Sequence, residues 1–324
     1  MKRVFVFEYL SGGGSIDGDA TAIEALMPLG LSMRDAVAGD LLRSGLFEVS
    51  VAVCESAPAR LDRAANTVCA RQGETMLAFV AREAVRHDVC WIVAPETAGL
   101  LARFESAVGA TRWLGCDRHA IAIATSKAAT LQRLAACCVA TPLAFEHDPA
   151  VMRWVVKPHD GAGTVDTRVH ALHREAVADA QRAAKAGAAM VVEPWVDGEA
   201  LSLSLLCSAH TAELLSINRQ RIAVDVGGRV SYAGVEVNAL DLTGPRAAAL
   251  QRLASDVHLA IPGLRGFIGI DLVWHAQRGP VVIEVNPRVT CAYIGLSAAL
   301  GRNLAAELVQ AHGAFMGEAL HALA

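Results

Sequence analysis

The residues best suited to chemistry are two carboxylates and one amide near the end of the chain. Asp271 lies in an apolar segment rich in β-branched residues, and Glu284 and Asn286 lie in the next such segment. Four turn-like residues, 276–279, separate the two segments. The pattern predicts a β-hairpin that carries all three polar side chains.

The register of this hairpin decides whether the three side chains meet. If His275 pairs with Pro280, Asp271 lies directly opposite Glu284, with the side chains about 5 Å apart. Asn286 lies two residues further on and therefore on the same face. Like charges so close together repel unless a cation lies between them, and all-oxygen ligands suit Mg²⁺ or Mn²⁺. A solvated hairpin face is the alternative, but the flanking residues are too apolar for an exposed sheet, so we predict a metal site.

A metal held by a few carboxylates usually shares its coordination with phosphate oxygens. The chain has no Gly-Lys dipeptide, which excludes a Walker A loop, and its glycines at 12–14 lack the spacing of a dinucleotide fingerprint. The remaining candidate is Lys157, which ends an apolar segment and precedes a loop with Gly161 and Gly163. The loop offers backbone N–H groups to a triphosphate and the lysine offers a point charge. Taken alone, Gly-Ala-Gly is more typical of an ordinary turn.

An acidic bend lies between the glycine loop and the hairpin. Glu193 ends an apolar segment and could accept a hydrogen bond from an adenine amino group. The backbone of Trp195 and Val196 could contact the edge of the ring. Glu199, at the start of an alternating strand, could hold the ribose hydroxyls. Either glutamate alone is more typical of surface charge, so the interpretation depends on the order of the motifs.

That order resembles the ATP-grasp superfamily of ATP-dependent carboxylate–amine ligases, over roughly residues 117–313. In that superfamily two lysines contact the nucleotide phosphates, and Lys127 and Lys157 match them. The resemblance also implies two magnesium ions bound by Asp271, Glu284 and Asn286, and an arginine, Arg288, that steadies the transferred phosphoryl group. Lys157 and Arg288 are therefore the expected catalytic residues.

Two departures from the superfamily pattern affect these assignments. Many members have Asp-Lys where this chain has Ser126 and Lys127. Some relatives also have an arginine at the position of Gly269, two residues before the metal-binding aspartate. With a neutral glycine at position 269, Arg288 alone would supply the positive charge beside the metal site.

Alternating segments divide the chain into three parts. Residues 1–115 alternate strands and helices, which predicts a small parallel α/β domain of the Rossmann-like kind. Residues 116–187 form the expected lid subdomain, and 188–324 the C-terminal subdomain with an antiparallel sheet and the metal hairpin. The predicted fold class is α/β (α+β), with the ATP-grasp fold that the resemblance implies.

Composition is typical of an intracellular enzyme. The chain has 324 residues and a net charge of −4, which gives no indication of a nucleic-acid partner or an anionic membrane surface. Charged residues interrupt every long apolar stretch, so we expect no membrane span. The eight cysteines include no Cys-x-x-Cys pair, which favours reduced thiols in a cytoplasmic protein. The partners expected are small-molecule substrates, and a homo-oligomer is compatible with the sequence.

The substrate is indicated only by the first strand, which ends in Glu8 and Tyr9 and runs into Gly12 and Gly13. Ligands of parallel sheets bind beyond the carboxyl ends of the strands, so these residues could face substrate, although a plain strand exit is equally compatible. The motif is similar to the ATP-grasp branch that contains tyramine–glutamate ligase of methanofuran biosynthesis. That similarity implies joining of the glutamate side-chain carboxylate to tyramine or tyrosine. A ligase for dipeptides or for peptide tailoring, and a non-catalytic nucleotide-binding protein, are the alternatives.

Overall fold

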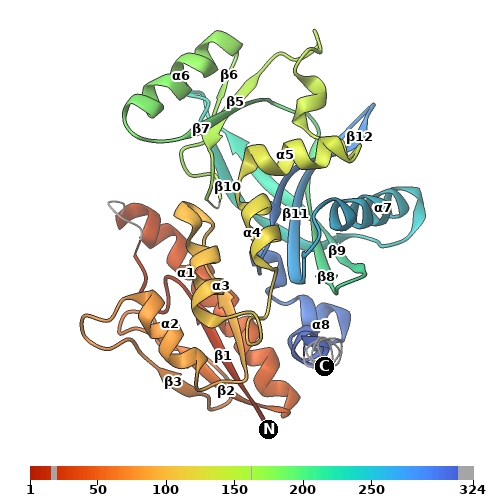
Figure 1. Ribbon diagram of the computed structural model, residues 1–324. Helices are drawn as coiled ribbons and strands as arrows, with labels where there is room; N and C mark the ends of the chain where they lie inside the picture. The colour runs from red at the N-terminus through yellow and green to blue at the C-terminus, as the bar shows by residue number, and fades with distance from the viewer. Residues whose placement is uncertain (16–19, 162, 313–324) are drawn as a thin grey trace.

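The computed structural model describes residues 1–15, 20–161 and 163–312 (Figure 1). Ala162, within the predicted phosphate loop, and residues 313–324, at the end of the predicted C-terminal part, lie outside the described residues. The described residues form three β-sheets: a parallel sheet near the N-terminus, a small antiparallel sheet and a five-stranded antiparallel sheet. None of the helices described is both long and apolar enough to cross a membrane.

The N-terminal part is a parallel sheet with strand order β3-β2-β1-β4 and helices on both faces. The strand β1 is buried on both faces because Phe5 and Phe7 pack toward α2 and α3, whereas Val4 and Val6 pack toward α1. The elements of this part are β1 Lys2–Glu8, α1 Ala20–Ser44, β2 Phe47–Ala52, β3 Asn66–Val68, α2 Met76–Ala84, β4 Val89–Val93, η1 Thr97–Gly99 and α3 Leu100–Val108.

The first helix, α1, begins at Ala20 and carries Pro28 in its interior. The segment before Pro28 is rich in alanine, leucine and methionine, which favour helix enough to continue past the proline. An interior proline removes one N–H donor and its ring crowds the carbonyl four residues earlier, so the helix continues past Pro28 at a local cost.

The middle part combines three α-helices with the three-stranded sheet β6-β5-β7. The strand β7 pairs with β5, so this sheet extends beyond residue 187, where the sequence placed a boundary. The helices α4 and α5 pack against β12 of the C-terminal sheet (Figure 1). The elements are α4 Arg118–Thr125, α5 Lys127–Ala136, η2 Pro142–Phe145, β5 Trp154–Pro158, β6 Arg168–His170, α6 His173–Lys185 and β7 Met190–Pro194.

The C-terminal part is the antiparallel sheet β10-β9-β8-β11-β12. Its strands alternate: Leu201, Leu203 and Ile270 pack with the helix α7, while Ser202 and Asp271 point to the other face. This alternation places the polar side chains of β8 and β11 on the face turned away from α7. The elements are β8 Glu199–Cys207, β9 Ala212–Val224, β10 Val230–Leu240, α7 Gly244–Ala260, β11 Gly266–His275, β12 Gly279–Asn286, η3 Cys291–Tyr293 and α8 Leu296–Leu300.

Candidate nucleotide and metal site

The predicted hairpin is present, but its register differs from the one we assumed. His275 pairs with Gly279, one residue away from the expected partner Pro280. A continuous ladder from that pair would place Asp271 opposite Ile283. A β-bulge at Ile283 shifts the register by one residue, and Asp271 then pairs with Glu284. The assumed pairing was therefore wrong, and the predicted juxtaposition of the two carboxylates was right because of the bulge.

The three oxygen-bearing side chains lie together at this point. Asn286 Nδ2 donates to Asp271 Oδ2 at 3.1 Å, and Gln220 Nε2 on β9 donates to Asp271 Oδ1 at 2.9 Å. Burial, and next the negative charge of Glu284, raise the pKa of Asp271 to about 7. No described group of three His, Cys, Asp or Glu side chains could hold a metal, so a site here needs the Asn286 amide oxygen as its third ligand. Two carboxylates and an amide oxygen fit Mg²⁺, which would also relieve the repulsion between the carboxylates.

Lys127 connects this carboxylate pair with the glycine loop. It is the first residue of α5, after the N-cap Ser126, whose Oγ accepts from the Ala129 N–H. The buried Lys127 ammonium lies 3.3 Å from Glu284 Oε1 and donates to the Gly161 carbonyl at 3.0 Å. Serine at position 126 thus supplies the helix cap, and the lysine lies where phosphate and metal ligands would meet.

Lys157 and Glu193 form the second buried ion pair of the site. They lie on the neighbouring strands β5 and β7, and Lys157 Nζ is 2.7 Å from Glu193 Oε2. The other oxygen, Glu193 Oε1, is buried and has no hydrogen-bond partner among the described residues. A buried acceptor without a donor is costly, so this oxygen is suited to a donor that a ligand brings, such as an adenine amino group.

Other parts of the acidic bend are held by the protein itself. The Trp195 N–H donates to the Arg153 carbonyl at 2.9 Å, so this one donor is used within the protein, and contact of the Trp195 and Val196 backbone with a base stays a prediction. Val196 is buried directly after it. Glu199 pairs with Arg219 and Arg246; burial opposes ionisation, but the hydrogen bonds from these arginines lower the pKa of Glu199 overall. The carboxylate therefore stays charged at neutral pH.

The glycine loop contacts the N-terminal part. Gly161 and Gly163 both have positive φ, at 94° and 75°, which disfavours other residues there. Asp160 Oδ2 accepts from the Ala98 N–H at 2.8 Å. A Cβ atom on Gly161 would lie 3.1 Å from Thr97 Oγ1, so the loop lies close to η1.

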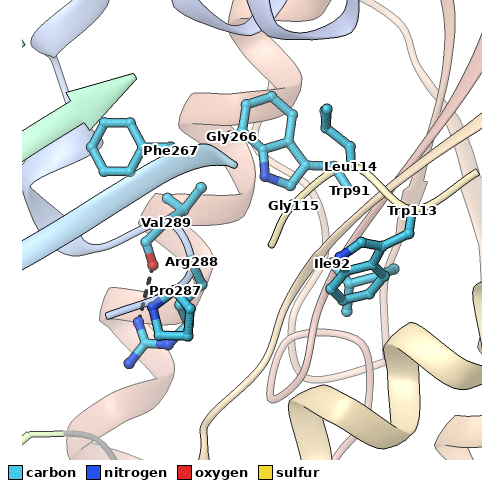
Figure 2. Close-up of a pocket in the computed structure, with 10 residues that line it drawn as sticks. All are labelled: Trp91, Ile92, Trp113, Leu114, Gly115, Gly266, Phe267, Pro287, Arg288 and Val289. Atoms are coloured by element: carbon cyan, nitrogen blue, oxygen red, sulfur yellow. Dashed lines mark hydrogen bonds between the residues drawn. The ribbon is translucent and has the colours of Figure 1, made fainter. Parts of the chain in front are cut away.

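Arg288 closes the site from the side of the N-terminal sheet. Its guanidinium forms an ion pair with Glu96: Nη2 donates a hydrogen bond to Oε2 at 3.0 Å, and Nε lies 2.8 Å from Oε1 without forming one. Figure 2 shows its third contact, from Nη1 to the Val289 carbonyl at 3.0 Å. Pro287, Arg288 and Val289 lie on one side of a cavity of about 10 Å³, and tryptophans 91 and 113 of the N-terminal part lie on the other (Figure 2). The interface between the N-terminal part and the segment 287–289 therefore leaves almost no empty space next to Arg288.

Two parts of the chain match known protein families. Residues 124–292 match the family model described as ATP-grasp domain, and residues 47–121 match a pre-ATP-grasp domain. The first match covers more than half of the chain. The chain belongs to the ATP-grasp family.

Solved structures agree with the predicted α/β fold of this ATP-grasp protein. A protein from Archaeoglobus fulgidus, named as an ATP-grasp superfamily member, has a TM-score of 0.68 at 22% identity, covering 96% of this chain and 88% of that one. The L-amino acid ligase from Bacillus licheniformis has a TM-score of 0.67 at 16% identity, with coverages of 96% and 74%. D-alanine–D-alanine ligase from Bacillus anthracis, complexed with ATP, has a TM-score of 0.66 at 14% identity, with coverages of 98% and 99%. At these identities the likeness shows the fold alone, and the comparison with curated proteins found no significant match.

In the first loop of the ATP-grasp protein, two of the predicted substrate residues, Glu8 and Tyr9, make hydrogen bonds within the loop itself. The buried Glu8 carboxylate accepts from the N–H groups of Leu10 and Ser11, at 3.2 and 2.8 Å. The Tyr9 hydroxyl donates to the Ser15 carbonyl at 2.9 Å. The same loop contains Gly12 and Gly13, and Gly13 has a φ of 104°. Glu8 therefore has a structural role in this loop, and contact of the four residues with substrate stays a prediction.

Two residues of the site were not identified from the sequence. Gln220 lies on β9, 51 residues from the Asp271 that it contacts, and no local pattern marks it. Glu96 follows the buried strand β4, and its position beyond the carboxyl end of a parallel strand is a signal that could have identified it.

Proposed function

We propose that this ATP-grasp protein is an ATP-dependent ligase that forms an amide bond through an acyl phosphate. The observation that carries the proposal is the pairing of Asp271 with Glu284 beside Lys127. It places two acidic ligands and a cation within one small volume next to a glycine loop. Such a set suits a metal–triphosphate complex, and we expect Mg²⁺, with Mn²⁺ as the alternative ion.

The first half-reaction transfers a phosphoryl group to the substrate. A carboxylate oxygen attacks the γ-phosphorus of ATP, the bond to the oxygen that bridges the β- and γ-phosphates breaks, and ADP and an acyl phosphate result. Magnesium held by Asp271, Glu284 and Asn286 would neutralise charge on the phosphate oxygens. Lys127 and Lys157 add positive charge from the side of the glycine loop, which stabilises the transition state.

The second half-reaction makes the amide. The neutral amine attacks the acyl carbon, the bond to the phosphate oxygen breaks, and the nitrogen loses a proton as phosphate leaves. An acyl phosphate hydrolyses if water reaches it, so the glycine loop must cover the site during this step. Its contacts with Lys127 and Ala98 are consistent with that covering role.

For the substrates, we propose the glutamate side-chain carboxylate and an aromatic amine, tyramine or tyrosine. The support is the similarity of the N-terminal motif to the branch that contains tyramine–glutamate ligase, and it implies a role in methanofuran-type cofactor biosynthesis.

Dipeptide formation is the second candidate. It is favoured by the similar folds of an L-amino acid ligase and of a D-alanine–D-alanine ligase. Both candidates use the same nucleotide chemistry, and they differ only in the second substrate.

The proposal is tested by hydroxylamine trapping. With ATP, Mg²⁺ and glutamate, we expect γ-glutamyl hydroxamate, ADP and phosphate. AMP and pyrophosphate would instead indicate adenylation and would overturn the mechanism. A panel of amines and amino acids, with ADP release as the readout, then separates the two candidates: acceleration by tyramine or tyrosine supports the first, and acceleration only by other amino acids supports the second. Nucleotide binding without any ADP release would place the chain among non-catalytic binding proteins.

A further inference from the structure

The ion pair between Glu96 and Arg288 joins two parts of the chain that are 192 residues apart in sequence. Glu96 follows β4 of the N-terminal sheet, and Arg288 follows the metal-binding strand β12. The side chains are 3% and 11% exposed. Nη2 donates a charge-assisted hydrogen bond to Oε2, and Nε lies 2.8 Å from Oε1 as an ion pair without the geometry of a hydrogen bond. The pair therefore fixes the plane of the guanidinium in a place that solvent barely reaches.

Stability alone gives no reason for this pair. Removing two charges from water costs about as much as their attraction returns, and apolar side chains of similar volume often stabilise a protein as well. Arginine is not deprotonated in proteins, so the guanidinium stays charged beside Glu96. A guanidinium that is kept charged and buried beside the predicted metal ligands, despite the free energy of desolvation, is suited to binding an anionic reacting group.

The guanidinium also keeps donors for a ligand. Arginine has five N–H donors. The contacts described for Arg288 use Nε and Nη2 toward Glu96 and Nη1 toward the Val289 carbonyl. These contacts leave one N–H on Nη1 and one N–H on Nη2 without a partner among those named. The two N–H groups can point together at an anionic group only if the guanidinium plane is kept in one orientation.

The segment that carries Glu96 is itself held in an unusual backbone conformation. Ala98 has a φ of 52°, in the left-handed region that non-glycine residues rarely adopt. Its N–H donates to Asp160 of the glycine loop at 2.8 Å. Such strain persists where surrounding contacts over-determine it, often at functional sites. The segment 96–98 is thus fixed between the arginine on one side and the loop on the other.

We propose that Glu96 is a positioning residue that orients Arg288 toward the transferred phosphoryl group and so makes the N-terminal domain part of the active site. The inference rests on the proposed function and extends it to a domain that supplies none of the nucleotide-binding residues. Loss of the carboxylate would leave the guanidinium charged but free to rotate. The expected effect is on turnover, and binding of ATP should change little.

The test is kinetic and uses the full chain. Glu96→Gln should lower kcat by about 100-fold, the size expected for a misplaced charge partner, with KM for ATP changed less than twofold. Glu96→Asp keeps the charge and protects against misfolding, and it should lower kcat about tenfold. The matched control is Glu105→Gln, which removes a carboxylate from another ion pair, with Arg118, outside the site. It should leave kcat per folded molecule unchanged.

A double-mutant cycle separates positioning from a structural role. If Glu96 acts through Arg288, Glu96→Gln should cost little further activity in an Arg288→Lys background. Additive losses, or a kcat per folded molecule within twofold of wild type in both Glu96 variants, would overturn the proposal.

A readout without turnover keeps this inference separate from the proposed function. The ¹⁵Nε–¹Hε signal of Arg288, assigned by its absence in Arg288→Lys, should exchange slowly with water and shift when a nonhydrolysable ATP analogue and Mg²⁺ are added. It should exchange faster in Glu96→Asp. Absence of ADP release by the wild-type protein would refute the ligase proposal. The positioning role would be refuted if the Arg288 signal were the same in wild type and Glu96→Asp and did not change when nucleotide is added.

Discussion

Asp271 lies directly opposite Glu284 because β12 carries one residue more than β11 at this point, Ile283. The bulge corrects a ladder that starts from the pair of His275 with Gly279 and would otherwise bring an apolar side chain opposite the aspartate. One inserted residue thus determines that two carboxylates share one face of the sheet. The predictions below follow from that face and from the groups around it.

Glu284→Gln should abolish turnover at saturating Mg²⁺, with a loss of at least about 100-fold, because it removes a metal ligand and its charge. The thermal midpoint of the metal-free protein should not rise. Relief of the repulsion with Asp271 is offset by the buried Lys127, which loses its only carboxylate partner among the described ion pairs. ADP release and thermal unfolding measure the two effects. Glu213→Gln, on an exposed part of the same sheet, is the control, and full activity in Glu284→Gln would refute the metal assignment.

The free energy of unfolding of the metal-free protein should depend on Asp271 and pH. Its pKa is raised from 3.8 to about 7 in the folded state, so its contribution to stability is fully present below pH 4 and is lost as the pH rises to 7. Asp271→Asn removes this dependence. The variant should therefore gain stability relative to wild type between pH 5 and pH 8, by about 3 kcal/mol. Urea denaturation without metal at both pH values measures the difference, and an equal effect of the substitution at pH 5 and pH 8 would contradict the prediction.

The glycine loop should become protected when nucleotide binds. In the part of the chain that the structure describes, the backbone N–H groups of Asp160, Gly161 and Gly163 have no acceptor. Phosphate oxygens would supply one. We expect the exchange of these amides to slow at least about tenfold on adding a nonhydrolysable ATP analogue and Mg²⁺. The turn at 225–228 should not respond, and unchanged exchange in the loop would exclude it as the phosphate site.

Gly269→Ala should disturb the segment that carries Arg288. A Cβ atom at this position would lie 2.6 Å from Thr290 Cγ2, too close for an unshifted structure. We expect a loss of about 1–3 kcal/mol in the free energy of unfolding and a lower kcat. Thr290→Ser removes the clashing methyl group, so Gly269→Ala combined with Thr290→Ser should recover most of the loss. No recovery in the double variant would show that steric contact with Thr290 is not the cause.

The sequence by itself determined the local elements and the order of the motifs. Side-chain period distinguishes strand from helix over a few residues, so the hairpin with Asp271 and Glu284, the strand before Lys157 and the parallel N-terminal sheet could all be predicted. The family resemblance depended on the same local motifs. It was confirmed by the match of residues 124–292 to the ATP-grasp family model.

Only the tertiary structure decided which groups meet. The pairing of Lys127 with Glu284 depends on how α5 packs against the C-terminal sheet. The bulge at Ile283 and the hydrogen bonds of Glu8 within its own loop are local features of the backbone that side-chain period does not reveal. The pair of Glu96 with Arg288 joins residues 192 positions apart, and no local periodicity records such a partner. Local sequence sets the backbone and the direction of each side chain. Packing between distant segments decides which charged side chains form pairs. The packing excludes water, and a buried charge without a partner then costs free energy.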